Sequence, residues 1–508
     1  MTVPRVYVGD RSVPLAAVKE RASRLASGLG ALGIGHGDRY AIVLRNEVAF
    51  LEASLAGGVI GAIGVPVNWH WTGEDLRHLL RDSGAKCVIV HTDLLPAVEI
   101  HAPSEMKIIE AEVTQELIDA YDLGATPLTG RYPSLDDLIA QHGPVAEPNT
   151  EPPMGVIYTS GTTGLAKGIL RNPIRSEDVP ALTSGVCQML KLKPEWRTLL
   201  PAPLYHTAPN VHGTFAAALG MNIHIMPRFD PVKFLQIVQD YRVDTVQMVP
   251  TMFTRLLQLP QEDRESYDLS SLKAVVHAAA PCPPQLKRAI IDWLGPIVHE
   301  YYGGSEGAAW VMCNSEEALS HPGSVGRPLM DAKIRIFGPD PEPLPAGEPG
   351  VIYGKSYSGW PDFTYIGQDE QRHAIERDGY ITVGDIGYLD EDGFLYLIDR
   401  VSDTVISGGV NIYPAEIEAC LHDMDGVADV AVFGIPDPDL GEAIAAHVEL
   451  LPGAQLSADD VRSFVQTNLA KYKVPRVVVF DEKLPREDTG KLFKRRLKAL
   501  YWPEGQRI

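Results

Sequence analysis

The segment Tyr158-Thr-Ser-Gly-Thr-Thr-Gly-Leu-Ala-Lys-Gly168 has the composition of a phosphate-binding loop. Its hydroxyl donors are Thr159, Ser160, Thr162 and Thr163, and its glycines are Gly161, Gly164 and Gly168. Glycine lets the backbone turn tightly and present N–H groups to an anion. Lys167 adds a compact positive charge that suits a polyphosphate. We therefore predict that this segment binds phosphate.

The segment departs from the common P-loop pattern, G-x-x-x-x-G-K-[ST]. Gly168 follows Lys167, where the P-loop has serine or threonine, so kinase and GTPase folds are not favoured. A surface loop rich in serine, threonine and glycine would have the same composition. The run Gly155-Val-Ile-Tyr158 favours phosphate binding, because it predicts a short strand leading straight into the loop.

The composition predicts two or more folded domains, since 508 residues exceed what one hydrophobic core usually holds. Lys and Arg number 45 and Asp and Glu number 66, which gives a formal net charge of −21. A chain this acidic is not expected to bind nucleic acid or an anionic membrane through a general field. Any polyanionic ligand would be held by local donors.

Cysteine usage and hydropathy favour a cytoplasmic location. The cysteines are Cys87, Cys187, Cys282, Cys313 and Cys420. They are scattered without C-x-x-C spacing, which fits a reducing compartment and argues against zinc or a disulfide framework. The first residues lack the pattern of a secretory signal. The longest apolar run, 55–67, is too short to span a bilayer and predicts a helix end followed by a strand.

Helix and strand patterns alternate through the first 300 residues. Apolar residues at helical spacing predict a helix over 15–32. Predicted strands are 40–44, 87–90, 107–109, 245–249, 274–277 and 298–302. Short apolar strands separated by helices are typical of α/β domains with largely parallel sheets. Ligands of such sheets bind beyond the carboxyl ends of the strands, where we expect the loop at Thr159 to lie.

The pattern of predicted helices and strands changes in the last third of the chain. From about 324 to 399, short strands divided by Gly, Pro and Asp predict a small β subdomain. Helices at 414–422 and 457–469 and strands at 430–433 and 443–450 then predict a compact α+β unit. We therefore predict an N-terminal domain over residues 1–400, which includes the β subdomain, and a C-terminal domain over residues 401–508.

Four later segments are as distinctive as the loop. They are Glu300-Tyr-Tyr-Gly-Gly-Ser-Glu-Gly307, Gly384-Asp-Ile-Gly-Tyr-Leu-Asp-Glu-Asp-Gly-Phe-Leu-Tyr-Leu-Ile-Asp-Arg400, Ser407-Gly-Gly-Val-Asn-Ile-Tyr-Pro-Ala-Glu-Ile-Glu418 and Leu484-Pro-Arg-Glu-Asp-Thr-Gly-Lys491. With these motifs in this order over nearly its whole length, the chain resembles the adenylate-forming superfamily of acyl-CoA synthetases, adenylation domains and luciferases. The resemblance is closest to the acyl-CoA ligases.

The resemblance implies a large N-terminal domain of stacked, mostly parallel sheets and a small, mobile C-terminal domain. It also implies a reaction in two steps. A carboxylate attacks the α-phosphate of ATP to give an acyl-adenylate and pyrophosphate, and the thiol of coenzyme A then displaces AMP. Mg²⁺ is the implied cofactor, because it neutralises charge on the departing pyrophosphate.

The phosphate and metal ligands implied by the resemblance lie in two motifs. The loop from Thr159 to Lys167 would hold the β- and γ-phosphates. Glu306 would bind Mg²⁺, with Thr162 or Thr163 nearby.

The resemblance implies a separate set of contacts for the nucleoside. Asp385 would accept hydrogen bonds from both ribose hydroxyls, and Arg400 would be a second ribose or phosphate contact. Tyr302 would stack near the adenine. Gly303 and Ser305 belong to the same nucleotide motif, in which many relatives have threonine in place of Ser305.

Lys491 is the implied catalytic lysine, which would bridge the substrate carboxylate and the α-phosphate. On charge alone, a solvated basic helix is the simpler explanation of the Lys and Arg residues at 491–498. The Thr-Gly pair directly before Lys491 matches the family's closing motif and favours catalysis.

In the family the C-terminal domain rotates between the two half-reactions, so that Lys491 acts first and a glycine loop faces CoA second. That loop is Ser407, Gly408 and Gly409 here. By motif position the hinge falls at Ser402, where relatives usually have Asp or Lys, although Asp403 is adjacent.

Two other classes of function remain open at this point. The segment Gly303-Gly-Ser-Glu-Gly307 also fits G-x-S-x-G, the nucleophile elbow of α/β hydrolases, with Ser305 as nucleophile and His422 or His447 as base. That alternative gives the phosphate loop, Asp385 and Lys491 no role. The second alternative is an adenylate-forming enzyme that passes its acyl group to an amine or a carrier protein.

The acyl pocket is expected near the small residues Ala278, Ala279, Ala280, Gly307 and Ala308, since small side chains leave room for a ligand. His206 at its mouth would orient the carboxylate or gate the pocket, or would be a structural histidine. We expect a sizeable apolar acid, whether fatty, aromatic or polycyclic, rather than acetate. The sequence leaves the oligomeric state open, a homodimer included.

Overall fold

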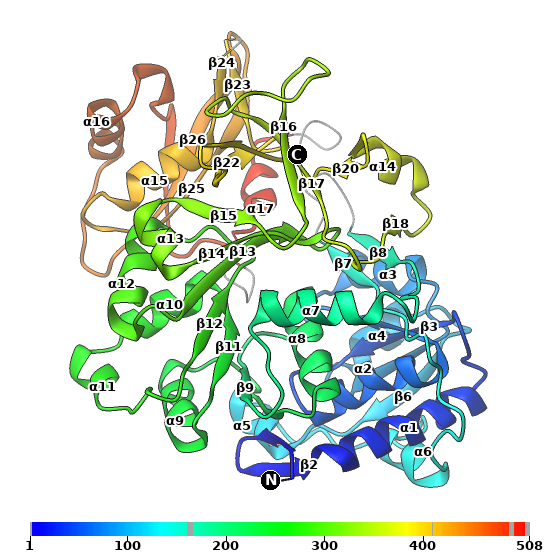
Figure 1. The fold of residues 1–508 in the computed structure, drawn as a ribbon. Coiled ribbons are helices and arrows are strands. Elements are labelled where there is room, and N and C mark those ends of the chain that lie inside the picture. Colours follow the sequence, from blue (N-terminus) through cyan, green and yellow to red (C-terminus); the bar gives the residue numbers. More distant parts are fainter. Residues whose placement is uncertain (1–2, 160–165, 409, 487–491, 503–508) are drawn as a thin grey trace.

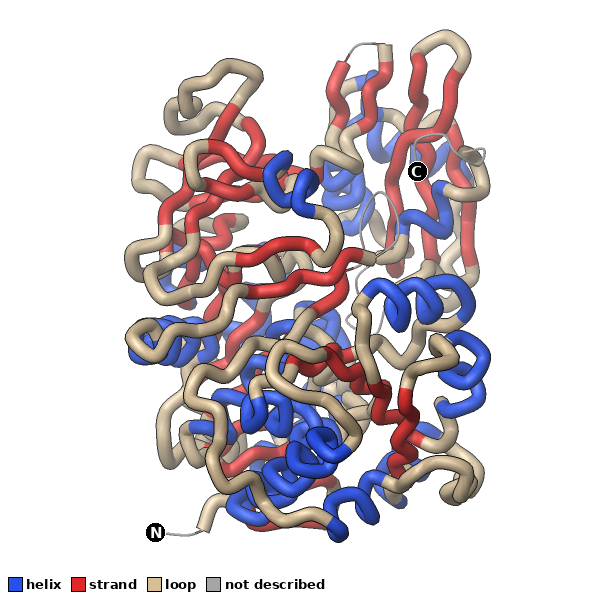
Figure 2. The backbone as a smooth tube through the Cα atoms, turned by 90° about the vertical axis from the view of Figure 1, so that its right-hand side faces the viewer, coloured by secondary structure: helices blue, strands red, loops and turns tan. Residues whose placement is uncertain are grey.

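The computed structural model describes residues 3–159, 166–408, 410–486 and 492–502. Its elements form a large N-terminal part and a smaller C-terminal part, which lies at the top of the view in Figure 1 in orange and red. Figure 2 shows the same arrangement from the side. No helix in the described residues is long and apolar enough to cross a membrane.

A four-stranded parallel sheet lies near the N-terminus. Its strands, in order, are β4 (Ile63–Pro66), β3 (Arg39–Val43), β5 (Cys87–His91) and β6 (Lys107–Ala111). Its helices are α1 (Leu15–Ala31), α2 (Val48–Ile60), α3 (Gly73–Asp82), α4 (Leu95–His101), α5 (Gln115–Tyr121) and α6 (Leu135–Gln141). Every residue of β5 is buried, as expected for a parallel strand covered on both faces.

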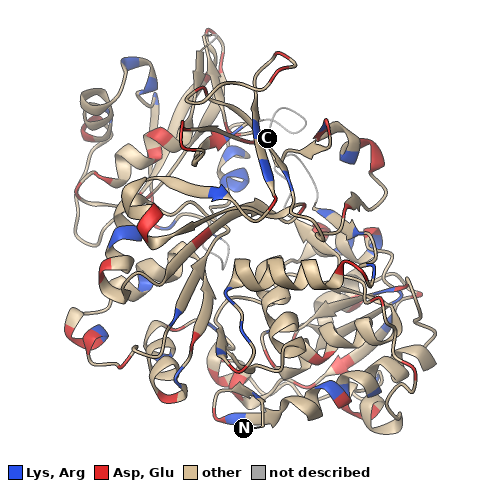
Figure 3. Cartoon of the chain, viewed as in Figure 1, with Lys and Arg blue, Asp and Glu red and all other residues tan. Residues whose placement is uncertain are grey.

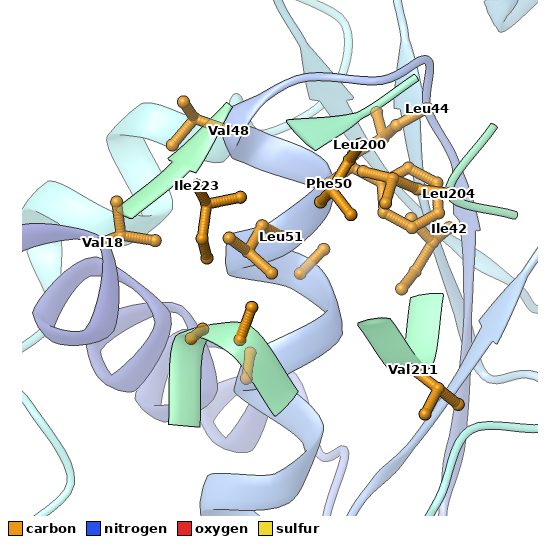
Figure 4. Close-up of a cluster of buried hydrophobic side chains, with 14 of the residues drawn as sticks. Val18, Ile42, Leu44, Val48, Phe50, Leu51, Leu200, Leu204, Val211 and Ile223 are labelled. Atoms are coloured by element: carbon orange, nitrogen blue, oxygen red, sulfur yellow. The ribbon is translucent and has the colours of Figure 1, made fainter. Parts of the chain in front are cut away.

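The second sheet has 15 strands among the described residues. Its parallel half contains β10 (Asn222–Ile225), β9 (Arg197–Leu200), β11 (Thr245–Met248), β12 (Ala274–His277) and β13 (Val298–Gly304), flanked by β1 (Arg5–Val8) and β2 (Arg11–Pro14). The helices of this half are α7 (Val179–Leu190), α8 (Thr207–Ala218), α9 (Pro231–Tyr241), α10 (Pro250–Leu257), α11 (Gln261–Glu265) and α12 (Pro284–Leu294). The core fills the space between the two sheets, where Val18, Leu51 and Ile223 belong to one buried cluster (Figure 4).

The antiparallel half of this sheet contains the predicted β subdomain. Its strands are β14 (Ala308–Asn314), β15 (Ser324–Pro328), β16 (Lys333–Phe337), β17 (Gly350–Lys355), β19 (Glu376–Arg377), β20 (Tyr380–Ile381), β21 (Asp385–Leu389) and β22 (Leu395–Arg400), with helices α13 (Ser315–Ser320) and α14 (Asp369–Ala374). Because β15 pairs with both β14 and β22, these strands continue the large sheet through unbroken hydrogen bonding.

The loop at 160–166 connects two strands of a small antiparallel sheet, ordered β18-β8-β7. The strands are β7 (Ile157–Thr159), β8 (Lys167–Arg171) and β18 (Phe363–Tyr365). The strand that leads into the loop, β7, therefore lies in an antiparallel sheet and not in a parallel one as we expected. An apolar run predicts a strand but not its partner: β7 pairs with β8, and β8 pairs on its other side with β18, about 200 residues later.

The C-terminal part has its own sheet and core. It contains β23 (Val405–Ser407), β24 (Val410–Ile412), β25 (Val427–Asp437), β26 (Gly441–Leu450) and β27 (Val477–Asp481), the helices α15 (Pro414–His422), α16 (Ala458–Asn468) and α17 (Lys494–Lys498), and a 3-10 turn at Lys471–Lys473. Its buried cluster includes Ile417, Val432 and Val465. The α/β fold with a small α+β C-terminal domain is as predicted. Basic and acidic residues are interspersed over both parts (Figure 3).

Candidate active site

The β7–β8 hairpin places Thr159 directly opposite Lys167. The predicted phosphate ligands between them, Ser160, Gly161, Thr162, Thr163 and Gly164, lie outside the described residues. The ammonium of Lys167 is 5.3 Å from the ring centroid of Tyr365 on β18. Gly168 packs against Tyr158, since a Cβ there would be 2.7 Å from the ring carbon Cζ. The start of β8 is thus packed against both neighbouring strands, β7 through Tyr158 and β18 through Tyr365.

Ser305 and Glu306 form the turn between β13 and β14. The two strands approach closely at Gly303, where a Cβ would be 1.8 Å from the carbonyl oxygen of Ala308. The Ser305 hydroxyl is hydrogen-bonded to the Thr207 hydroxyl at 2.9 Å, and the Ser305 carbonyl accepts from Arg171. The turn is therefore tied to both α8 and β8.

This geometry excludes the serine hydrolase alternative. A nucleophile elbow joins a strand to a helix, whereas Ser305 joins two antiparallel strands. His447 belongs to the C-terminal core, and both its ring nitrogens are engaged, Nδ1 with Asp481 at 2.6 Å and Nε2 with Tyr501 at 2.9 Å. His422 lies 4.0 Å from Asp429, also in the C-terminal part.

The carboxylate of Glu306 accepts a hydrogen bond from the Tyr365 hydroxyl at 3.0 Å through Oε1. Burial and the neighbouring Glu306 raise the pKa of Tyr365, so its proton stays on the phenol. The described residues contain no group of three or more His, Cys, Asp or Glu able to hold a metal. A single half-buried carboxylate fits Mg²⁺, which usually combines one or two carboxylates with substrate phosphates. The predicted second ligand, Thr162, lies outside the described residues.

Asp385 is the centre of a trio joined by one hydrogen bond and one ion pair. Its side chain is 10% exposed and accepts from the Tyr302 hydroxyl at 2.7 Å through Oδ2. Arg400 Nε lies 3.0 Å from Oδ1, because Asp385 and Arg400 are paired across β21 and β22. Burial and Asp385 raise the pKa of Tyr302. Three residues predicted to surround the nucleoside are therefore adjacent, and Tyr302 contacts Asp385 through its hydroxyl.

His206 is the N-cap residue of α8, so it directly precedes the Thr207 that contacts Ser305. Its ring lies 4.4 Å from that of Tyr205, centroid to centroid. His206 is thus next in sequence to Thr207, the residue that contacts the Ser305 turn.

The small residues of the predicted acyl pocket have local structural reasons for their size. Gly307 packs against the indole of Trp310, where a Cβ would be 2.4 Å from Nε1. Ala279 and Ala308 have positive φ values of 74° and 59°, which disfavour bulky side chains. Ala278 is buried, Ala279 is exposed and Ala280 is intermediate. The small size of Gly307, Ala279 and Ala308 therefore does not by itself indicate space for a ligand.

The hairpin predicted to face CoA joins β23 and β24. Ser407 ends β23, and Gly408 has a φ of 57° and donates its N–H to Leu440 at 2.8 Å. Gly409 and the predicted catalytic lysine, Lys491, lie outside the described residues.

Of the two predicted hinge residues, Asp403 is bound to α17. Lys498 lies 2.9 Å from Asp403 and Lys494 lies 2.8 Å from Glu418. Burial raises the pKa of Asp403, but Lys494 and Lys498 outweigh it and the net pKa is lowered.

Asp399, at the end of β22, accepts from the N–H of Ala415 on α15 at 3.0 Å. Burial raises its pKa to about 6, although Lys494 opposes the change. This bond joins the N-terminal sheet to the first helix of the C-terminal part.

Sequence reasoning missed Tyr365, Arg171 and Thr207. None lies in a motif used for the resemblance. Tyr365 belongs to a short run rich in aromatic residues that predicts a strand but gives no reason to choose it as a functional residue. A single signal was available for Arg171, an arginine directly after the apolar pair Ile169 and Leu170 at the end of a short strand.

The comparisons with known proteins cover both parts of the chain. The family described as "AMP-binding enzyme" matches residues 4–359, and "AMP-binding enzyme C-terminal domain" matches residues 416–491. A feruloyl-CoA synthase of an Amycolatopsis species is 33% identical, covering 96% of this chain and 93% of that protein. The long-chain-fatty-acid–CoA ligase FadD13 of Mycobacterium tuberculosis is 31% identical, covering 97% and 94%. The crystal structure of ATP-bound MatB from Rhodopseudomonas palustris matches with a TM-score of 0.81 at 26% identity, covering 98% and 96%.

Proposed function

The chain belongs to the AMP-binding family of adenylate-forming enzymes, and from this membership we propose that it is an ATP-dependent ligase joining a sizeable apolar carboxylic acid to coenzyme A. The enzyme class, acid–thiol ligase, follows from the full-length relatives. The observation that carries the site is the trio of Tyr302, Asp385 and Arg400, which brings together residues from two separate nucleotide motifs.

In the first step an oxygen of the acid attacks the α-phosphorus of ATP. A bond forms between the carboxylate oxygen and phosphorus, and the bond from phosphorus to the β-bridging oxygen breaks, so that pyrophosphate leaves with the electron pair. Thr159 and Lys167, at the two ends of the loop, would bind the β- and γ-phosphates. Glu306 would hold Mg²⁺, which neutralises charge on the leaving group. Asp385 and Arg400 would orient the ribose.

Lys491 is our proposed bridge between the carboxylate and the α-phosphate. Its positive charge would stabilise the negative charge that is redistributed as the new bond forms.

In the second step the CoA sulfur attacks the acyl carbon, the bond from acyl carbon to AMP oxygen breaks, and the thiol proton goes to solvent. The hairpin containing Ser407 and Gly408 would face the thiol after the C-terminal part turns about Ser402 and Asp403. A glycine at 408 suits close approach of the backbone, because it has no side chain and readily adopts the φ of 57° found there.

The size of the acid is supported by the relatives, whose names specify feruloyl and long-chain fatty acyl groups. An amine or a carrier protein is the alternative acceptor of the acyl group. The choice between CoA and these acceptors concerns the second step alone.

One experiment tests both steps. Acid-dependent pyrophosphate release is measured over a panel of acetate, octanoate, palmitate, cinnamate and a polycyclic acid, with and without CoA. We expect release with the larger acids and a CoA thioester only when CoA is present. Equal turnover of acetate and octanoate would refute the substrate proposal, and pyrophosphate release without any thioester would favour the other acceptors.

A further inference from the structure

We propose that Arg171 and Tyr365 are positioning residues that hold the Ser305–Glu306 turn ready for a metal–triphosphate group. This inference rests on the proposed function, because it takes Glu306 as the metal-binding carboxylate. It adds two residues that lie outside every motif of the resemblance.

Arg171 fixes the backbone of the turn. It ends β8, its residue is 5% exposed, and its guanidinium donates to the Ser305 carbonyl. The guanidinium carbon lies 5.3 Å from the ring centroid of Trp360. No carboxylate within the described part of the chain forms an ion pair with Arg171, and its Nε has no hydrogen-bond partner there. Burial lowers its pKa to about 10, although Glu306 opposes the change.

A buried charge without a bound counterion destabilises a protein, so an arginine here would be disfavoured if packing were its only role. Leucine or methionine would fill the same volume at lower cost. The buried arginine is explained if its positive charge acts on anionic ligands that bind and leave. The Glu306 carboxylate would then lie between these ligands and the arginine.

Tyr365 fixes the side chain of the same turn. Its hydroxyl donates to Glu306 Oε1 at 3.0 Å and leaves Oε2 for another ligand. On β18, Tyr365 pairs with Ile169, and Phe363 pairs with Arg171 itself. One small sheet therefore holds the Ser305 backbone from β8 and the Glu306 carboxylate from β18. The phosphate loop ends at Lys167 in the same sheet, and the Lys167 ammonium lies over the Tyr365 ring.

The proposal predicts a selective effect on nucleotides. A metal–triphosphate requires Glu306 in a single orientation, whereas AMP has no β- and γ-phosphates and depends on the Asp385 trio. Loss of the Tyr365 hydroxyl would free the Glu306 side chain and weaken Mg·ATP binding by about tenfold, the scale of one hydrogen bond to a charged group. AMP affinity would stay within about twofold.

The test is calorimetric binding of ATP and of AMP, each with saturating and limiting Mg²⁺, to wild type, Tyr365→Phe and Arg171→Lys. Arg175→Gln is the matched control, because Arg175 is an exposed arginine just after β8 with a side chain 68% exposed. We expect both variants to lose Mg·ATP affinity and to need more Mg²⁺, while the control behaves as wild type. Tyr365→Phe keeps the ring, so it remains informative if Arg171→Lys folds poorly.

Equal losses for AMP and Mg·ATP would show that the two residues only support the fold, and unchanged Mg·ATP binding would show that they do not position Glu306. Either result would overturn the inference. The assay needs neither acid nor CoA, so it is independent of substrate identity. Failure of wild type itself to bind ATP would instead overturn the proposed function.

Discussion

Replacing Tyr302 with phenylalanine removes one hydroxyl, and we expect it to weaken AMP binding by about tenfold. The lost hydrogen bond runs from the Tyr302 hydroxyl to Asp385 Oδ2 over 2.7 Å. Asp385 is 7% exposed, so water has poor access to replace the donor. A hydrogen bond to a charged group contributes about 1.5–3 kcal/mol, and about 1.4 kcal/mol corresponds to a tenfold change in affinity. Arg400 still holds the other carboxylate oxygen, so we expect the lower end of this range.

The assay is calorimetric binding of AMP and 2′-deoxy-AMP to wild type, Tyr302→Phe and Tyr301→Phe. Tyr301 is the neighbouring residue on β13 and points to the opposite face of the strand, so its variant controls for loss of a tyrosine hydroxyl. If Tyr302 orients Asp385 toward the ribose, its variant should lose part of the preference for AMP over 2′-deoxy-AMP. The reasoning is refuted if the two nucleotides lose affinity equally, or if Tyr302→Phe binds AMP as wild type does.

Three further predictions concern other parts of the chain. Lys491→Ala should slow adenylation by about 10²–10³-fold, the effect of losing one donor to the transition state, while CoA attack on a preformed acyl-adenylate survives; equal losses in both half-reactions would contradict this. Asp399→Asn tests the pKa of about 6. Because the folded protein favours the protonated acid, the free energy of unfolding of wild type relative to the variant should fall as pH rises from about 4 to 6, by at most about 3 kcal/mol. A difference between wild type and variant that does not change with pH would argue against this pKa. Gly168→Ala should lower the free energy of unfolding by about 1–3 kcal/mol through overpacking, since its Cβ would lie 2.7 Å from Tyr158 Cζ; an unchanged thermal midpoint would count against this contact.

Element type was predictable from the sequence where periodicity was strong. The helix expected over 15–32 is α1 (Leu15–Ala31), and the strands expected at 87–90 and 274–277 are β5 and β12 within one residue. Strand partners were not predictable, because pairing such as Ile169 with Tyr365 depends on tertiary packing rather than on local pattern. For the same reason, the antiparallel pairing of β7, the strand that leads into the phosphate loop, was not predicted.

Individual residues of the candidate site were predictable from the sequence, but most of the contacts between them were not. Tyr302 was found in one motif and Asp385 and Arg400 in another, and the hydrogen bond and ion pair that join them appear only when β13, β21 and β22 are in register. Tyr365 and Arg171 carry no motif, so only the β18–β8 pairing brings them to the Ser305 turn. The acyl pocket was inferred from residue size, and close contact with the Trp310 indole explains the small size of Gly307 equally well.

The pairing of β8 with β18 also determines when the nucleotide site can form during synthesis. Tyr365 follows Ile169 by 196 residues, whereas the parallel sheet of β3 to β6 is complete by Ala111. Contacts between distant residues form late, because the intervening loop must first be closed. A ribosome-bound chain that ends before Phe363 is therefore expected to contain the N-terminal sheet but to bind no ATP. Nascent chains would thus be unable to bind nucleotide until most of the protein has left the ribosome.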